Sequence, residues 1–169
     1  MFIMNKIYVV IGIIVVLIVA TAGTYMLTST VQENLAPNFT LVDLEGNTFT
    51  LSDFSGKVVV IDFMATWCGP CRQQIPQYSA IWENYKDQVV LISISIDPLS
   101  DSEQTLQSFK ENFDAPWIWA RDTENISVVY EISSIPTTVI IDKQGIIRFK
   151  HVGVTSSATL IRDIEQLLG

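Results

Sequence analysis

The sequence predicts an α/β fold in which a mixed central sheet is flanked by helices, with an apolar segment ahead of it. Two apolar runs, 58–63 and 89–96, are typical of strands that are buried on both faces of a sheet. Between them, apolar residues recur at the spacing of a helix. A hairpin and an amphipathic helix follow nearer the C-terminus. Because strands and helices alternate in this way, we expect helices packed on a single sheet.

The N-terminal segment differs from the rest of the chain because Lys6 is its only charged side chain. Residues 7–27 are uncharged and long enough to cross a hydrocarbon core of ~30 Å. By the positive-inside bias, Lys6 and the chain amine predict a cytoplasmic N-terminus at 1–6. We therefore expect a transmembrane anchor at 7–27, a tether at 28–36 and an exported domain at 37–169.

A cleaved signal sequence is the alternative interpretation of the same segment. Ala20-Thr21-Ala22 is an A-x-A sequence after an apolar region of suitable length, which a signal peptidase would accept. Apolar residues continue beyond it through 25–27, which favours a retained anchor. Both possibilities stay open, and the domain is extracytoplasmic in either case.

The charge of the chain limits its partners. With 18 acidic and 10 basic residues, the chain has a formal net charge of −8. An acidic domain argues against nucleic acid or an anionic membrane surface as a partner. Both cysteines of the chain lie in one short motif, so the domain must be held together by its hydrophobic core rather than by further disulfides.

The N-terminal half of the domain is predicted to hold a hairpin, a strand and a helix. Alternating residues at 39–43 and 48–51, on either side of a Glu-Gly-Asn turn, predict the hairpin. A polar turn at 52–56 precedes the buried strand at 57–63. In the helix that follows, Pro76 is expected to produce a kink.

The C-terminal half continues the alternation after the strand at 89–96. Its predicted elements are, in chain order, a helix at 103–113, a short strand at 117–120, a short helix at 125–130, strands at 137–142 and 146–152, and a closing helix. A Lys-Gln-Gly turn joins the last two strands into a hairpin. Ser156 and Ser157 cap the closing helix, whose leucines and isoleucines share one face.

Both cysteines lie in the stretch Trp67-Cys68-Gly69-Pro70-Cys71, between the buried strand and the helix after it. In this context a Cys-x-x-Cys pair is typical of a dithiol/disulfide couple. Cys68 is expected at the helix N-terminus, where unpaired N–H groups and the helix dipole stabilise a thiolate. We therefore expect Cys68 to be the nucleophile and Cys71, one turn further along, to be the resolving thiol.

Three other roles for the pair have less support. A structural zinc site needs four ligands, and the one histidine of the chain is His151. Haem attachment requires a histidine directly after the second cysteine, where this chain has Arg72. An inert disulfide across so short a loop removes little chain entropy. We therefore expect redox chemistry through the Cys68–Cys71 disulfide itself, with no other cofactor and no metal.

The run from Val58 to Cys71 closely resembles the active-site strand and motif of thioredoxins. The opening Ala36-Pro37-Asn38-Phe39, the lead-in at 51–57 and the apolar anchor look more like the membrane-anchored TlpA/ResA (redoxin) family. This resemblance covers roughly residues 36–168. It implies a thioredoxin fold with an N-terminal β-hairpin extension and a central α/β insertion, which the long spacing between Cys71 and Pro136 would accommodate.

The resemblance also implies roles for residues around the motif. Pro136 matches the cis-proline that faces the dithiol, a bend that an Xaa-Pro bond makes accessible. Ile135 before it would offer its backbone to an extended substrate, and Trp67 would shield the dithiol and shape the docking surface. Asp62 matches a carboxylate that thioredoxins bury under the second cysteine, where burial would fit it to accept a proton from Cys71. TlpA/ResA proteins often have Asn or another residue at this position, so proton handling here is expected to follow thioredoxins.

Five further positions support the motif or depart from the family pattern. Gly69, Pro70 and Pro76 match the family and support the motif. Gln74 stands where TlpA/ResA proteins often have a glutamate, and glutamine cannot titrate. Ser134 replaces a frequent glycine before the cis-proline pair, which is expected to narrow the substrate groove.

These features together predict a membrane-anchored, extracytoplasmic thiol:disulfide oxidoreductase. The Gly-Pro pair between the cysteines resembles that of reducing thioredoxins, so we expect a reductant of protein disulfides. The family resemblance implies a transmembrane thiol electron donor of the CcdA/DsbD kind. It also implies apocytochrome c thiols, as in cytochrome c maturation, or copper-site cysteines as substrates.

Two other functions are weighed against this one. Thiol peroxidases of the peroxiredoxin class share the fold. Their reactive cysteine needs Thr or Ser three residues earlier and Pro seven residues earlier, where this chain has Ala65 and Ile61. A copper-binding thiol chaperone would use the two thiols together with His151, since Cu(I) favours thiolates.

Overall fold

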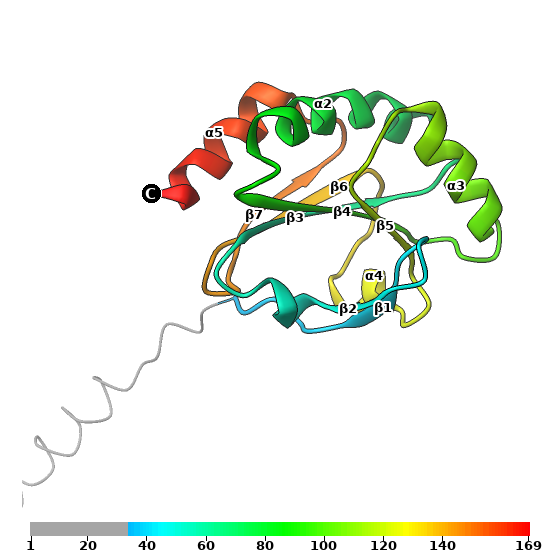
Figure 1. The fold of residues 1–169 in the computed structure, drawn as a ribbon, viewed down its shortest axis with the longest axis horizontal. Coiled ribbons are helices and arrows are strands. Elements are labelled where there is room, and N and C mark those ends of the chain that lie inside the picture. Colours follow the sequence, from blue (N-terminus) through cyan, green and yellow to red (C-terminus); the bar gives the residue numbers. More distant parts are fainter. Residues whose placement is uncertain (1–33) are drawn as a thin grey trace, which may run out of the picture. The chain divides into compact units, whose positions relative to one another are not determined.

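A five-stranded sheet runs through the part of the chain that the computed structural model describes, residues 34–169 (Figure 1). Its strands, in spatial order, are β5 Ile118–Arg121, β4 Val89–Ser95, β3 Val58–Met64, β6 Thr137–Ile141 and β7 Ile147–Val152. β3, β4 and β5 are parallel, whereas β6 runs antiparallel to β3 and β7 antiparallel to β6. The predicted mixed sheet is confirmed.

The central strand β3 is apolar along most of its length, and every one of its residues is buried. Its apolar side chains alternate between the two faces of the sheet: Val58, Val60 and Met64 on one, and Val59, Ile61 and Phe63 on the other. The same alternation turns Asp62 toward the face of Val60 and Met64. The one charged residue of the strand therefore lies on the face that the long helices cover.

Three helices cover that face: α2 Gly69–Tyr85, α3 Glu103–Asn112 and α5 Ser157–Leu168 (Figure 1). The other face is covered by the hairpin of β1 Thr40–Val42 and β2 Thr48–Thr50, the 3₁₀ helix η1 Leu51–Phe54 and the one-turn α4 Ile126–Val129. Helices flank both faces as predicted, but unevenly. The connections β3–α2–β4 and β4–α3–β5 each join a strand to the next strand toward the same edge of the sheet. Because such connections between parallel strands are right-handed, α2 and α3 lie on the same face of the sheet.

The predicted strands and helices between 39 and 168 are present, with ends that differ by a few residues. The β1–β2 hairpin is the predicted N-terminal extension, and α3 with β5 forms the predicted central insertion. One difference lies at 52–56, predicted to be a simple turn. There the chain forms η1, because the Asp53 carboxylate accepts a hydrogen bond from the Thr50 N–H at 2.7 Å and caps a short helix.

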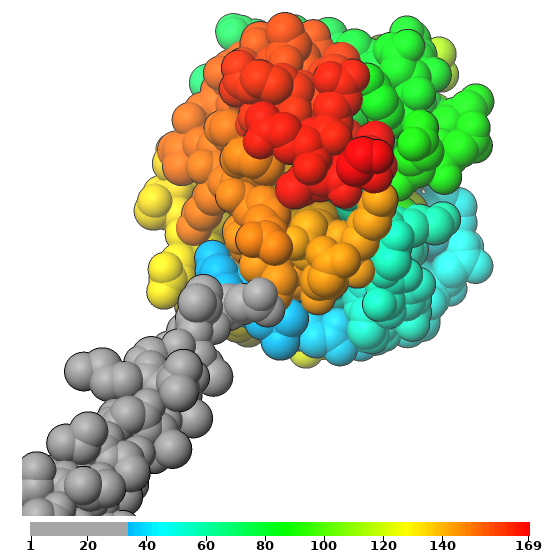
Figure 2. Space-filling view, turned by 90° about the vertical axis from the view of Figure 1, so that its left-hand side faces the viewer, coloured from blue at the N-terminus to red at the C-terminus, as the bar shows by residue number. Residues whose placement is uncertain are grey.

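The first described residues, 34–36, pack against the domain. Leu35 pairs with Ile146, and the Ala36 N–H donates to the Gly145 carbonyl at 2.9 Å. Figure 2 shows this segment, in blue, beside the orange turn between β6 and β7. The end of the segment predicted to be a tether is therefore bound to the sheet.

The predicted cytoplasmic N-terminus at 1–6, the anchor or signal sequence at 7–27 and most of the tether lie outside the described residues. Within 34–169, none of the helices combines the length and the apolar character that crossing a membrane requires. The predicted domain at 37–169, in contrast, is described in full.

Candidate redox site

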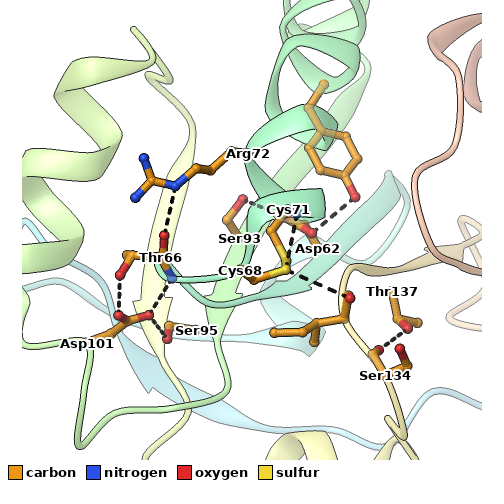
Figure 3. The surroundings of a disulfide bond; sticks show 12 residues. Asp62, Thr66, Cys68, Cys71, Arg72, Ser93, Ser95, Asp101, Ser134 and Thr137 are labelled. Atoms are coloured by element: carbon orange, nitrogen blue, oxygen red, sulfur yellow. Dashed lines mark hydrogen bonds between the residues drawn. A yellow bond between two sulfur atoms is a disulfide. The ribbon is translucent and has the colours of Figure 1, made fainter.

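Cys68 and Cys71 are joined by a disulfide at the start of α2, with their Cα atoms 5.2 Å apart (Figure 3). Cys68 is the N-cap residue of the helix, and its Sγ accepts a hydrogen bond from the Cys71 N–H at 3.2 Å. Pro70 lies in the first turn, where its missing N–H costs no helical hydrogen bond. The predicted position of Cys68 is confirmed, and it brings the positive end of the helix dipole to the sulfur.

The two cysteines differ in accessibility. Cys68 keeps 5% of its surface exposed, and Cys71 keeps 1%. Gly69 beside them is exposed, and a Cβ atom there would meet nothing within 4 Å. Trp67 on the other side is 60% exposed, and its indole N–H donates to the Asp97 carboxylate at 3.1 Å. An approaching group therefore reaches Cys68 first, between open backbone and a fixed aromatic ring.

The Ile135–Pro136 peptide bond is cis, as predicted, and lies next to the disulfide. The carbonyl oxygen of Ile135 is 3.9 Å from Cys68 Sγ. Pro136 is buried, while Ser134 is exposed and its carbonyl accepts the Thr137 hydroxyl at 2.6 Å. The structure thus brings the two predicted docking residues, Ile135 and Pro136, to the dithiol.

Asp62 is fully buried on β3, on the α2 side of the sheet (Figure 3). Its carboxylate accepts the Tyr78 hydroxyl at 3.2 Å and the Ser93 hydroxyl at 3.1 Å. Removal from water raises the pKa of Asp62 to about 7, because the two hydrogen bonds offset only part of the cost of burying the charge. A carboxyl group with this pKa can take up and release a proton near neutral pH.

The two hydroxyl groups that donate to Asp62, those of Tyr78 and Ser93, are themselves fixed by further hydrogen bonds. The Tyr78 and Thr138 hydroxyls are 2.7 Å apart, and the Trp117 indole N–H donates to Ser93 Oγ at 3.0 Å. These residues were not among the predicted site residues. A signal was present, because Ser93 and Thr138 interrupt apolar strands at the positions that pair with Asp62 in the sheet.

A second buried carboxylate, Asp101, holds the loop that leads into Cys68 (Figure 3). It accepts the Thr66 N–H at 2.9 Å, the Thr66 hydroxyl at 2.5 Å and the Ser95 hydroxyl at 2.5 Å. The Thr66 carbonyl accepts Arg72 Nε at 3.2 Å. Nothing in the local sequence marks Asp101, because the polar stretch after β4 resembles an ordinary surface loop.

Gln74 and Pro76 lie further along α2. Gln74 is fully buried, and its amide donates to the Thr155 carbonyl at 3.1 Å and accepts the Thr155 N–H at 2.6 Å. This glutamine therefore ties α2 to the segment before α5, which a glutamate could do only in part because it has no N–H to donate. Pro76 is exposed inside the helix, and its kink remains a prediction.

His151 lies on β7, where its Nε2 is 2.8 Å from the Asp163 carboxylate. Within residues 34–169, no three His, Cys, Asp or Glu side chains are grouped so that they could hold a metal ion. The copper-chaperone alternative required His151 together with both thiols, and the described domain does not assemble that set.

The site has the arrangement of one class of protein. The more accessible sulfur is already bonded to the less accessible one, so electrons enter and leave by disulfide exchange without an external cofactor. Together with a cis-proline beside the sulfur, this defines a thioredoxin-like thiol:disulfide oxidoreductase.

Comparison with known proteins narrows the assignment. The AhpC/TSA family matches residues 33–150, and the chain belongs to this family. It is 33% identical to thioredoxin-like protein YneN of Bacillus subtilis, over 79% of this chain and 76% of that one. It is 30% identical to the thiol-disulfide oxidoreductase ResA of the same species, over 93% of this chain and 90% of ResA. The solved structure of a thiol:disulfide interchange protein DsbE from Chlorobium tepidum is 30% identical, with a TM-score of 0.73 over 81% of this chain and 97% of that chain.

The predicted thioredoxin-like fold and enzyme class are confirmed by these relatives, and the predicted redox disulfide is present in the structure. The chain is a thioredoxin-like oxidoreductase that acts on protein thiols by disulfide exchange, with the Cys68–Cys71 disulfide as its redox group. The positions where a thiol peroxidase would need a hydroxyl group and a proline are occupied by Ala65 and Ile61, which are both fully buried. They give peroxide chemistry no support.

Proposed function

We propose that this protein is a reductant of protein disulfides outside the cytoplasm, with Cys68 as nucleophile and Cys71 as resolving thiol. The observation that carries the nucleophile assignment is the Cys71 N–H directed at Cys68 Sγ, 3.2 Å away, at the N-terminus of α2. In the reduced protein this N–H and the helix dipole would stabilise a thiolate on Cys68. Cys71 is less exposed and is reached only after Cys68. The Gly-Pro pair between the cysteines, which resembles that of reducing thioredoxins, supports the direction of electron flow.

The exchange proceeds in two displacements. The Cys68 thiolate attacks one sulfur of a substrate disulfide, forms a mixed disulfide and releases the other substrate sulfur as a thiolate. Asp62 then accepts the proton of Cys71, and the Cys71 thiolate attacks Cys68 Sγ and releases the second substrate thiolate. Two electrons have passed to the substrate, and the Cys68–Cys71 disulfide must be reduced again by a donor dithiol.

Trp67, Ile135 and Pro136 would hold the substrate at the reactive sulfur. Because the Ile135 carbonyl is 3.9 Å from Cys68 Sγ, a substrate cysteine that reaches this sulfur must lie along the backbone of the cis-proline segment. The exposed ring of Trp67 supplies apolar surface beside it. Gly69 and Pro70, both exposed, would support the motif by leaving the approach open, and Pro76 by shaping α2.

The nucleophile assignment is tested by trapping. Cys71→Ser should accumulate a mixed disulfide with a disulfide-bonded substrate such as insulin, because the resolving thiol is missing. Cys68→Ser should accumulate none. Trapping by Cys68→Ser instead would exchange the two roles and contradict the proposal.

The direction of electron flow is tested by the reduction potential. A reductant should have a potential close to that of thioredoxins, about −270 mV, and should reduce insulin when a dithiol donor is supplied. A value near that of strong oxidants, about −120 mV, would make the protein an oxidase of thiols. Catalysis of peroxide consumption at a rate comparable to insulin reduction would favour the thiol-peroxidase alternative.

We also propose that 7–27 is a transmembrane anchor, with 1–6 in the cytoplasm and the domain at 37–169 outside, joined by the tether at 28–36. The uncharged segment after Lys6 supports this topology. The alignment with ResA covers 93% of the chain and therefore includes part of 7–27. The protein should remain in the membrane fraction after an alkaline wash. Recovery of a shortened chain in the soluble fraction would indicate cleavage after Ala22.

A reductant outside the cytoplasm needs electrons from inside the cell. We propose a transmembrane thiol donor of the CcdA/DsbD kind, and apocytochrome c thiols or copper-site cysteines as substrates. In cells that lack the donor, alkylation of free thiols should find Cys68 and Cys71 fully oxidised. An unchanged redox state would exclude that donor.

A further inference from the structure

The loop between β3 and α2 is fixed by contacts that disulfide exchange itself does not require. Thr66, two residues before Cys68, has three polar groups, and all three are bonded. Its N–H and hydroxyl donate to Asp101 at 2.9 and 2.5 Å, and its carbonyl accepts Arg72 Nε at 3.2 Å. Asp101 is 1% exposed and also accepts the Ser95 hydroxyl at 2.5 Å.

These bonds enclose the two cysteines. Arg72 directly follows Cys71, so its bond to the Thr66 carbonyl closes a ring of chain that contains both sulfurs. The guanidinium group also lies over the Phe109 ring, 5.4 Å from its centre, which restrains it on the α3 side. Asp101 then ties the start of this ring to the end of β4 through Ser95.

We propose that Asp101 is a positioning residue of the redox reaction, which acts through Thr66 to hold Cys68 and Cys71 at disulfide-forming distance in the reduced protein. When the loop is fixed, the Cα separation of 5.2 Å is retained and little freedom is lost as the disulfide forms. Intramolecular reactions gain their rate and equilibrium advantage from such fixed geometry. Loosening the loop would weaken the disulfide and slow the attack of Cys71 on a mixed disulfide.

The test compares buried carboxylates at two places in the domain. Asp101→Asn replaces an acceptor of three hydrogen bonds with an amide that cannot accept all three. Asp122→Asn is the control, because Asp122 is also buried and accepts two backbone N–H groups, from Ile126 at 2.7 Å and Ser127 at 2.8 Å, at the start of α4. Both changes weaken a carboxylate-held loop, but one of these loops carries the cysteines.

The readout is the equilibrium constant for forming the Cys68–Cys71 disulfide against a glutathione buffer. For Asp101→Asn we expect a fall of about tenfold, which corresponds to about 30 mV toward a weaker reductant. Asp122→Asn should leave the constant unchanged. An unchanged constant in folded Asp101→Asn, or an equal fall in both variants, would overturn the proposal.

A second pair of variants covers the case in which Asp101→Asn does not fold. Thr66→Val removes the hydroxyl donor and should lower the constant in the same direction, whereas Thr66→Ser keeps the donor and should stay within about twofold of the unchanged protein. Equal constants for the valine and serine variants would also overturn the proposal. The expected slowing of the Cys71 attack rests on the proposed function of Cys71 as the resolving thiol. The equilibrium constant of the disulfide does not depend on which cysteine is the nucleophile. A failure of the positioning role of Asp101 is therefore distinguished from a failure of the proposed function.

Discussion

Asp62 and Asp101 are both buried near the disulfide, but the groups that donate to them differ. Asp62 accepts two side-chain hydroxyls at 3.2 and 3.1 Å, and burial raises its pKa to about 7. Asp101 accepts one backbone N–H and two hydroxyls, two of these bonds being 2.5 Å long. Similar burial therefore accompanies two different proposed roles. A carboxyl group with few donors suits proton transfer, and one with a backbone donor suits the fixing of a loop.

The largest expected effect is on the pH dependence of stability after Asp62→Asn. The pKa of Asp62 is about 7 in the folded protein against 3.8 for the ordinary group. Between these two pH values the folded state therefore holds a proton that the unfolded state has released. The contribution of Asp62 to the free energy of unfolding is therefore complete below about pH 4 and is lost as the pH rises through 7.

The asparagine variant has no such loss. Relative to the unchanged protein it should gain stability from about pH 4 to 7 and then level off, by up to about 4 kcal/mol. Urea unfolding at several pH values measures this difference. A difference that does not change with pH would mean that Asp62 is ionised in the folded protein throughout this range.

Asp101→Asn should change stability in the opposite direction. The amide cannot accept all three donors, so a buried donor is left unpaired, which costs about 2 kcal/mol. Urea unfolding of both variants at about pH 8 makes the comparison direct, because the Asp62 variant should then be more stable than the unchanged protein and the Asp101 variant less stable. Changes of the same sign would show that the two carboxylates do not differ in the way their donors indicate.

The proposed proton transfer by Asp62 can be measured as the resolution rate of a mixed disulfide on Cys68. The rate should rise with pH through about 7, as the Asp62 carboxyl group ionises and becomes able to accept the proton of Cys71. Asp62→Asn should slow resolution by about tenfold at pH 7 and shift the rise to higher pH, where Cys71 ionises unaided. The attack of Cys68 on the substrate serves as the internal control and should change little.

The sequence permitted prediction of those parts of the site that local pattern determines. Cys68 at a helix N-terminus follows from a strand, a turn and a helical pattern in succession, and Asp62 stands out as the only charge in a buried strand. Asp101 could not be recognised in this way. Its partner Thr66 is 35 positions away, and only the pairing of β3 with β4 brings the two together.

The same reason explains the incomplete prediction of the layers. Each helix is visible in the sequence as a periodic pattern, but the face that it covers depends on strand order. The order β5-β4-β3 places α2 and α3 on one side of the sheet. No residue within α3 indicates which face of the sheet the helix covers. An apolar stripe such as that of Leu106 and Phe109 packs equally well on either face.

The smallest expected effect is that of Gln74→Glu, which tests how hydrogen-bond donors affect the stability of a protein with a buried carboxylate near the disulfide. Gln74 is fully buried and exchanges two hydrogen bonds with the backbone of Thr155, and glutamate can keep only the bond from the Thr155 N–H. The variant should lose about 1 kcal/mol near pH 5 and more near pH 8, because the new carboxylate has one donor and must ionise or hold its proton in a buried position. Urea unfolding at both pH values measures the change.

Gln77→Glu provides a matched control, because Gln77 is half-buried and uses only its carbonyl oxygen, which accepts the Ser157 N–H at 2.9 Å. A glutamate at this position therefore keeps the bond. Equal losses at 74 and 77 would show that the donated hydrogen bond and full burial of Gln74 are not what stabilises this part of α2.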